Sequence, residues 1–216
     1  MKGVTKFFLD TEFHEYKRRT GWFKKTETDT IDLISIGIVA ENGEQFYKIC
    51  NEFDLDAAWD NEWLRENVLK SVFKDLNRAM GTYHKTYHYY TTNTFCKKHL
   101  KRLLKWRGSS RATIAEDIRH FVDRNLGQTE PSFYGYFCDY DWVVFAWLFG
   151  RMIDLPKHYP MFCLDLKQMM YDRDLSQSWK RGLQIENNEK HNALADAWEN
   201  HELYKAIIKH DEENKT

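Results

Sequence analysis

The stretch KFFLDTEF (residues 6–13) carries the strongest structural signal in the chain. Its three consecutive bulky apolar residues, Phe7, Phe8 and Leu9, indicate a buried strand. Asp10 and Glu12 follow at its C-terminal end, and residues i and i+2 of a strand point to the same face. Two adjacent carboxylates in an apolar setting repel each other unless a cation neutralises them. The pattern predicts a site for Mg²⁺ or Mn²⁺, although two solvated acids at a strand end would give the same tripeptide.

The composition limits the class of protein. A chain of 216 residues fits one domain that is long enough to bury a sizeable core. Its 32 basic and 33 acidic residues give a net charge of −1, which excludes a nucleic-acid-binding protein that is basic overall. Any nucleic-acid site must come from a local cluster of basic residues. The four cysteines are scattered without a C-x-x-C pair, and no apolar run has membrane-spanning length. We therefore expect a cytoplasmic protein with reduced cysteines and no membrane partner.

Hydrophobic patterns outline the remaining elements. Strands are predicted at residues 31–39 and 45–50 around the turn sequence Glu41-Asn42-Gly43, so that three antiparallel strands begin a sheet. Helical spacing follows at 60–69 and 114–126, then a strand at 132–138, a helix at 142–149 and a short strand at 161–164. A last helix runs from about His191 to His210. Residues 14–29 are predicted to be a basic loop, which is either a solvated hairpin connection or an arm that contacts substrate. Residues 173–190 are predicted to be a polar, loop-rich segment.

Residues 70–111 hide a strong local charge within a nearly neutral chain. Eleven basic residues stand there against Asp75 alone, and four tyrosines and Trp106 are interleaved with them. Such a mixture suits single-stranded nucleic acid, because phosphates bind the charges and bases stack on the rings. A solvated insertion with ordinary helices would have the same composition. We predict one domain over residues 1–216, with a basic, aromatic-rich insertion at about 71–110.

Acids recur where the ends of a sheet would bring them together. Asp10 and Glu12 follow the first strand, Asp141 lies near the start of the helix after the fourth strand, and Asp196 lies on the last helix. Four converging carboxylates suit two divalent cations about 3.5–4 Å apart, which together stabilise the attacking and leaving oxygens of a phosphodiester. Asp139 is an alternative to Asp141, because two residues upstream in a strand it would point the same way.

His191 lies five residues before Asp196. On one helix the two side chains would point about 140° apart, so the histidine is predicted to lie in the loop before the helix. There it could take a proton from water. A surface or helix-capping histidine is the ordinary alternative, and only the ordered set of acids and histidine makes the catalytic interpretation specific.

That ordered set, D-x-E, then strand–Asp–helix, then H-x-x-x-x-D, resembles the DEDDh 3′-5′ exonucleases of the RNase H-like superfamily. The resemblance is strongest to the branch typified by the mycobacterial polyadenylate-specific 3′-exoribonuclease AS. The matching stretches are LDTEF (9–13), IDLISIGIVAENG (31–43), WLRENVL (63–69), YDWVV (140–144), MIDLP (152–156), DLKQ (165–168) and HNALADA (191–197). The resemblance implies an α/β RNase H-like fold, a mixed central sheet flanked by helices. It also implies that Asp10, Glu12, Asp141 and Asp196 bind two Mg²⁺ or Mn²⁺ ions and that His191 is the general base.

The activity implied is metal-dependent 3′-5′ exonucleolysis that releases nucleoside 5′-monophosphates from single-stranded nucleic acid, with RNA favoured over DNA. Phe13 and Trp63 are candidates for stacking on the terminal bases, and Arg65 and Asn67 are candidates for further substrate contacts; core packing is the alternative for the two aromatic residues. A DNA 3′-5′ exonuclease and a catalytically silent nucleic-acid-binding module remain open as functions. The oligomeric state also stays open, with a homodimer as one option.

Overall fold

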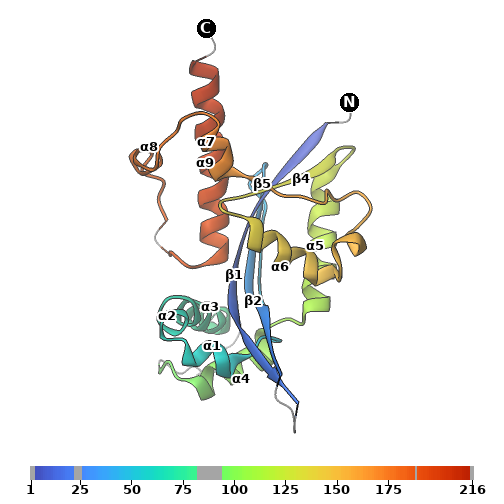
Figure 1. The fold of residues 1–216 in the computed structure, drawn as a ribbon, viewed down its shortest axis with the longest axis vertical. Helices are drawn as coiled ribbons and strands as arrows, with labels where there is room; N and C mark the ends of the chain where they lie inside the picture. The colour runs from blue at the N-terminus through green and yellow to red at the C-terminus, as the bar shows by residue number, and fades with distance from the viewer. Residues whose placement is uncertain (1–2, 22–25, 82–93, 188, 215–216) are drawn as a thin grey trace.

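The computed structural model describes residues 3–21, 26–81, 94–187 and 189–214. Within them, five strands form one mixed sheet in the order β3-β2-β1-β4-β5 (Figure 1). The strands β1 (Val4–Thr20), β2 (Thr26–Ala40) and β3 (Gln45–Ile49) are antiparallel neighbours. On the other side of β1, β4 (Glu130–Gly135) and β5 (Leu164–Asp165) pair in parallel. The predicted α/β architecture, a mixed sheet that begins with three antiparallel strands and is flanked by helices, is confirmed.

The apolar residues of β1 separate the two faces of this sheet. Phe7 and Leu9 are fully buried against α5 (Arg111–Leu126) and α6 (Asp139–Phe149). Phe8 points to the opposite face, where α7 (Leu166–Tyr171) and α9 (Ala193–Glu213) cover it. Figure 1 shows the strands lying between α5 and α9. Because side chains alternate along a strand, three consecutive apolar residues supply both cores at once.

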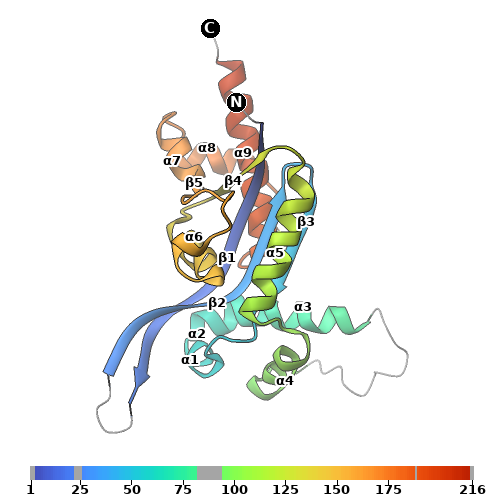
Figure 2. The ribbon, with the colours of Figure 1, turned by 90° about the vertical axis from the view of Figure 1, so that its right-hand side faces the viewer.

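A group of short helices, which we call the helical lobe, packs beside the C-terminal end of β3 (Figure 2). It comprises α1 (Leu55–Asp60), α2 (Glu62–Leu64), the π-helical turn η1 (Arg65–Leu69), α3 (Lys70–Gly81) and α4 (Lys97–Arg107). These helices share one apolar cluster with Ile34 and Ile49 of the sheet. Residues 60–69 are helical as predicted, but they are divided among the end of α1, α2 and η1. Of the predicted insertion, α3 and α4 belong to this lobe, while residues 82–93 lie outside the described residues.

The described residues of segment 14–29 are strands and not the predicted basic loop, and they pair antiparallel as the hairpin alternative requires. Residues 14–20 and 26–29 continue β1 and β2 as a two-stranded arm that projects beyond the helices (Figure 2). Its charges pair across the strands: Arg19 Nε lies 2.8 Å from Glu27 Oε1, and Lys17 Nζ lies 3.9 Å from Asp29 Oδ1. Such cross-strand ion pairs stabilise a solvated two-stranded ribbon. Its sequence therefore lacks the alternation of apolar and polar residues by which strands are predicted.

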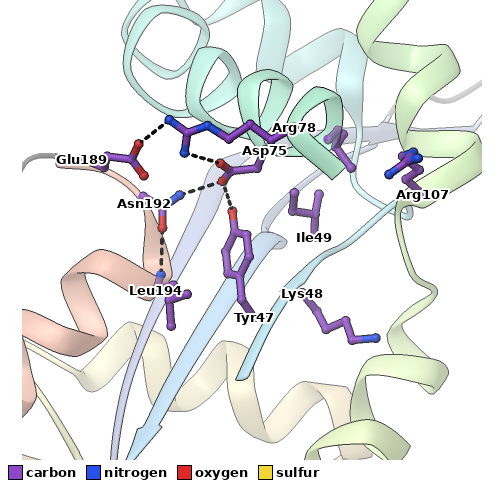
Figure 3. Close-up of a pocket in the computed structure, with 10 residues that line it drawn as sticks. Tyr47, Lys48, Ile49, Asp75, Arg78, Arg107, Glu189, Asn192 and Leu194 are labelled. Carbon is purple, nitrogen blue, oxygen red and sulfur yellow. Dashed lines mark hydrogen bonds and ion pairs between the residues drawn. The ribbon is translucent and has the colours of Figure 1, made fainter. Parts of the chain in front are cut away.

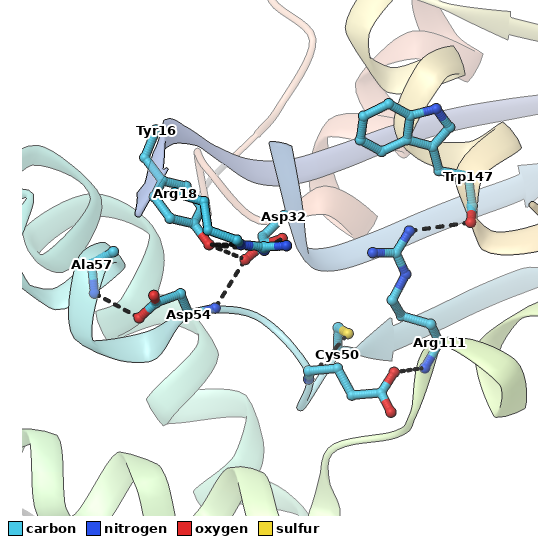
Figure 4. A network of polar contacts seen from close by, with 9 residues as sticks. Tyr16, Arg18, Asp32, Cys50, Asp54, Ala57, Arg111 and Trp147 are labelled. Atoms are coloured by element: carbon cyan, nitrogen blue, oxygen red, sulfur yellow. Dashed lines mark hydrogen bonds and ion pairs between the residues drawn. The ribbon is translucent and has the colours of Figure 1, made fainter. Parts of the chain in front are cut away.

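Asp32 of β2 anchors the base of this arm (Figure 4). Its buried carboxylate accepts hydrogen bonds from Tyr16 Oη at 2.9 Å, from Arg18 Nη2 at 2.7 Å and from the backbone N–H of Asp54 at 3.0 Å. Asp54 in turn caps α1 through Ala57 N. One carboxylate thereby fixes the arm to the first turn of the helical lobe.

Two further short helices lie in the second half of the chain. The predicted loop-rich segment at 173–190 contains α8 (Gln177–Gly182), and η2 (Met152–Asp154) follows α6. Each helix within the described ranges is too short or too polar to traverse a lipid bilayer.

Candidate active site

Three acids from the two ends of the chain meet on one face of the sheet. Asp10 and Glu12 project from β1, and Asp196 projects from the first turn of α9. One carboxylate oxygen of each lies within 4.8 Å of the others. A β-bulge follows immediately, because Glu12 pairs with Ser35 while Phe13 pairs with Leu33, so that β2 carries one extra residue there. Bulges beside a cluster of functional side chains redirect the strand locally.

Asp141, in the first turn of α6, lies beside this cluster but is not one of the three acids within 4.8 Å of one another. Its Oδ1 accepts hydrogen bonds from the backbone N–H of Thr11 at 2.8 Å and from Thr11 Oγ1 at 2.6 Å, which tie it to the residue between Asp10 and Glu12. Asp141 is 7% exposed, whereas Asp139 is exposed. Because α6 begins at Asp139, the two acids point about 160° apart and not in the same direction. Of the two alternatives, the structure brings Asp141 to the cluster.

The surroundings of these four carboxylates disfavour their charges. Burial, followed by the charges of Asp141 and Asp196, raises the pKa of Asp10 well above its ordinary value. Burial and the same two acids raise the pKa of Glu12 to about 8. Burial also raises the pKa of Asp141 to about 6, although the hydrogen bonds from Thr11 oppose this. The pKa of Asp196 rises because of burial, against a hydrogen bond from Asn187. A cluster of this kind needs positive charge to be ionised at neutral pH.

Gly37 allows α9 to approach the sheet. It pairs with Asp10 across β1 and β2. A Cβ atom placed on Gly37 would lie 2.2 Å from the carbonyl oxygen of Ala193 and 2.5 Å from the Cα of Leu194. The backbone of α9 therefore begins directly on the glycine, and this contact holds Asp196 above Asp10.

His191 lies in the loop before α9, as predicted, with Asn192 as the N-cap of the helix. Its φ of +60° places it in the left-handed region, which histidine tolerates better than most residues. Its ring makes a T-shaped contact with the ring of Trp63 of α2, with ring centroids 4.8 Å apart. A cavity of about 250 Å³ brings His191, Asp10 and Asp196 together; its other lining residues are Tyr136, Lys180, Lys190, Glu199 and Asn200.

The remaining residues predicted to contact substrate lie in two places. Phe13 stacks on Tyr140 of α6 at 6.0 Å between ring centroids, and Trp63 is 53% exposed beside His191. Arg65 donates from Nη1 to the carbonyl oxygen of Trp59 at 3.0 Å, and Asn67 donates from Nδ2 to that of Trp63 at 2.9 Å. Trp63 is thus at the site, while the polar groups of Arg65 and Asn67 already bond to the backbone of the helical lobe.

Several residues at the site carried no signal in the sequence. Asn187, within the polar segment, donates from Nδ2 to Asp196 Oδ1 at 2.6 Å and to Glu199 Oε2 at 3.0 Å. Lys180 of α8 pairs with Glu199 at 2.7 Å, and its ammonium lies 3.9 Å from the ring centroid of Tyr136. Glu199 lies three residues after Asp196 on α9, and this i, i+3 spacing is the one available indication in the sequence.

Comparisons with known proteins identify the family of this chain. The model of the Rv2179c-like 3′-5′ exoribonuclease domain family matches residues 6–208. Two curated relatives from two strains of Mycobacterium tuberculosis, 3′-5′ exoribonuclease MT2234.1 and 3′-5′ exoribonuclease Rv2179c, are each 28% identical to this chain over 207 residues. Each alignment covers 96% of this chain and 95% of the relative. Because the family model spans nearly the whole sequence, the chain belongs to the Rv2179c-like 3′-5′ exoribonuclease domain family.

Proposed function

We propose that this chain is a two-metal 3′-5′ exoribonuclease of the DEDDh type on an RNase H-like fold, which hydrolyses single-stranded RNA ends to nucleoside 5′-monophosphates. The observation that carries the proposal is the cluster of Asp10, Glu12 and Asp196, whose oxygens lie within 4.8 Å of one another beside Asp141 and His191. The family supports the substrate class and the polarity of cleavage.

The acids fit divalent cations that prefer oxygen ligands. Mg²⁺ binds oxygen at about 2.0–2.1 Å, so two ligands on opposite sides of one ion lie about 4 Å apart. The three oxygens, all within 4.8 Å of one another, are close enough to be ligands of the same ion. The raised pKa values of Asp10 and Glu12 supply the electrostatic reason, because a cation replaces mutual repulsion with attraction. Asp10, Glu12, Asp141 and Asp196 would hold two Mg²⁺ or Mn²⁺ ions.

The residues around the acids have separate tasks in this proposal. Bound cations would neutralise the phosphodiester and stabilise the charge that develops on its oxygens. His191 takes the proton from the attacking water, and the ring of Trp63 limits the directions in which the imidazole can turn. Thr11 holds Oδ1 of Asp141 through two hydrogen bonds, and the other carboxylate oxygen would be the one to hold a cation. Phe13 and Trp63 stack on terminal bases. Arg65 and Asn67 would contact substrate through atoms other than those that bond to the carbonyl oxygens of Trp59 and Trp63.

Matched 20-nucleotide RNA and DNA strands with a 5′ label test the proposal. The RNA should shorten stepwise from its 3′ end in Mg²⁺ or Mn²⁺, release nucleoside 5′-monophosphates and stay intact in chelator. Faster shortening of the DNA would identify a DNA 3′-5′ exonuclease. Internal fragments, or hydrolysis that persists in chelator, would contradict the two-metal exonuclease.

A first prediction concerns the charged face of α4. Lys98, Lys101 and Lys105 are exposed and lie on one face, with spacings i, i+3 and i+7, whereas Lys97 is paired with Asp56 at 2.7 Å. If this face binds phosphates, replacing the three lysines with glutamine should weaken binding of a 20-nucleotide RNA and leave dinucleotide hydrolysis unchanged. Each lost contact should lower the slope of log K against log salt by about 0.7. Fluorescence anisotropy at several salt concentrations measures this slope.

The control variant removes the same number of positive charges from lysines outside α4. Lys157, Lys205 and Lys209 are also exposed, and their replacement with glutamine should leave the salt slope at its original value. Equal weakening by both triple variants would show a general charge effect. Equal loss on dinucleotides and on 20-nucleotide RNA would show that α4 supports the site itself.

A second prediction concerns Gly37. Gly37→Ala must displace backbone atoms of Ala193 and Leu194, because its Cβ would overlap them. We expect a loss of about 1–3 kcal/mol in the free energy of unfolding, as for other overpacked contacts. Displacing Asp196 and His191 by even 1 Å should also reduce turnover by about 10²-fold. Urea denaturation and initial rates on RNA measure the two effects.

Gly182→Ala is the matched control, because nothing lies within 4 Å of a Cβ at that position. It should keep both stability and turnover. A Gly37→Ala variant with unchanged turnover would show that close contact between α9 and the sheet is not required for catalysis.

A further inference from the structure

We propose that Asp75 and Asn192 are positioning residues for His191. They form a hydrogen-bonded link between the helical lobe and the loop that carries the histidine (Figure 3). The inference rests on the proposed role of His191 as the base and adds the groups that set its orientation. Asp75 is also the single acid between Lys70 and Arg111, so the basic segment contains one residue that acts through the active site.

Asn192 uses both ends of its side-chain amide. Its Oδ1 accepts from Leu194 N at 3.1 Å and from Ala195 N at 3.2 Å, which caps α9. Its Nδ2 donates to Asp75 Oδ2 at 2.8 Å and lies 3.3 Å from Ser71 Oγ. The side chain is 5% exposed, so its hydrogen bonds form away from water. An asparagine supplies this combination of acceptor and donor, whereas an aspartate supplies the acceptor alone.

Asp75 is itself held in place from two other directions. The hydroxyl of Tyr47 on β3 donates to the same oxygen, Asp75 Oδ2, at 2.9 Å. The guanidinium of Arg78 lies 3.9 Å from Asp75 Oδ1 and 3.0 Å from Glu189, two residues before His191. Figure 3 shows these side chains from β3, α3 and the loop converging on one carboxylate. The sheet and the lobe therefore both constrain the residues that flank the histidine.

The loop needs such a link for two reasons. His191 has a φ of +60°, a conformation that a side chain with a Cβ adopts at a free-energy cost and keeps only when its surroundings enforce it. A cavity of about 480 Å³ also lies beside the link and is lined by Tyr47, Asp75, Arg78, Glu189 and Asn192. Because one side of the link borders this space, hydrogen bonds and not dense packing hold the loop there.

Asn192→Asp tests the link without removing the helix cap, because aspartate caps helices about as well as asparagine. The new carboxylate would face Asp75 in place of the donor. We expect the kcat on a dinucleotide to fall by about 10²-fold, the loss that a misplacement of about 1 Å causes. The double variant Asp75→Asn with Asn192→Asp puts a donor opposite the new acid, and it should recover most of the lost kcat. An unrecovered double variant would overturn the inference.

The same substitution in a His191→Ala background separates positioning from general damage. If Asn192 acts through His191, Asn192→Asp should lower the kcat of His191→Ala by no more than about twofold, because coupled residues are not additive. A further loss of about 10²-fold in that background would overturn the positioning role and leave the base role intact. A His191→Ala variant with wild-type turnover would overturn the base role, and the inference with it.

Should Asn192→Asp not fold, Tyr47→Phe provides a second test. It removes the hydroxyl that holds Asp75 and keeps the ring. Turnover should fall several-fold in the wild-type background and stay unchanged in the His191→Ala background. Equal losses in both backgrounds would overturn the inference.

Discussion

Asp10→Ala and Asp196→Ala should each reduce RNA hydrolysis by at least about 10³-fold, because each removes a ligand from the site at which charge develops in the transition state. The two acids come from β1 and α9, so they test both ends of the cluster independently. Initial rates on 5′-labelled RNA, with chelator-treated protein and added Mg²⁺, measure the loss. Asp139→Asn is the control, since Asp139 is exposed and points away from the cluster, and it should keep wild-type turnover. Near-wild-type rates in both alanine variants would contradict the metal site.

The same cluster predicts how stability depends on pH when no cation is bound. The folded-state pKa of Glu12 is about 8, above its ordinary value of 4.5, with burial as the main cause. A carboxyl group with a raised pKa contributes stability that is fully present below the ordinary pKa and is lost as the pH rises through the folded-state value. Chelated protein should therefore lose thermal stability between about pH 5 and pH 9. Asp10→Asn should lose less, because one of the repelling charges is gone.

Added Mg²⁺ should restore this stability, and more strongly at pH 9 than at pH 5. A ligand stabilises the folded state only as far as it binds that state better than the unfolded chain, and protonated acids bind cations poorly. Thermal unfolding followed by circular dichroism at pH 5, 7 and 9, with and without Mg²⁺, measures the effect. A Mg²⁺-induced shift in Tm that is equal at all three pH values would contradict a site built from these acids.

Local periodicity was sufficient for the parts of the fold and site that depend on one element. Two-residue alternation in β1 places Asp10 and Glu12 on the same face, and the five-residue separation of His191 and Asp196 puts the histidine before the helix. The arm formed by residues 14–20 and 26–29 could not be found in this way. Its stability comes from cross-strand pairs such as Arg19–Glu27, which leave a charged sequence without a pattern of burial.

Contacts between distant elements explain what the sequence could not predict at the site. Thr11 reaches Asp141 across 130 positions, and Asn192 reaches Asp75 across 117. Gly37 is necessary only because the start of α9, over 150 residues away, lies directly on it. Asp75 was recognisable as the single acid of a basic segment, yet only the packing of the helical lobe against the sheet gives it a role.

His191→Ala should lower turnover by about 10²–10⁴-fold and leave cation binding largely intact. The reason is that His191 lines the cavity with Asp10 and Asp196 but does not belong to the group of residues whose ligand atoms lie within 4.8 Å of one another. Loss of a base slows proton transfer from water, whereas loss of a ligand removes the cation itself. Single-turnover rates on RNA measure the loss of turnover, and calorimetric titration with Mn²⁺ measures the affinity for the cation.

The comparison with Asp196→Ala decides the role of the histidine. If His191 is the base, its alanine variant binds Mn²⁺ like the wild type, whereas Asp196→Ala binds it much more weakly. His120→Ala is the control for losing an imidazole, because His120 is exposed on α5 and pairs with Glu116, and it should preserve both rate and affinity. If His191→Ala weakened Mn²⁺ binding as much as Asp196→Ala does, His191 would be a metal ligand, and another group would have to accept the proton from water.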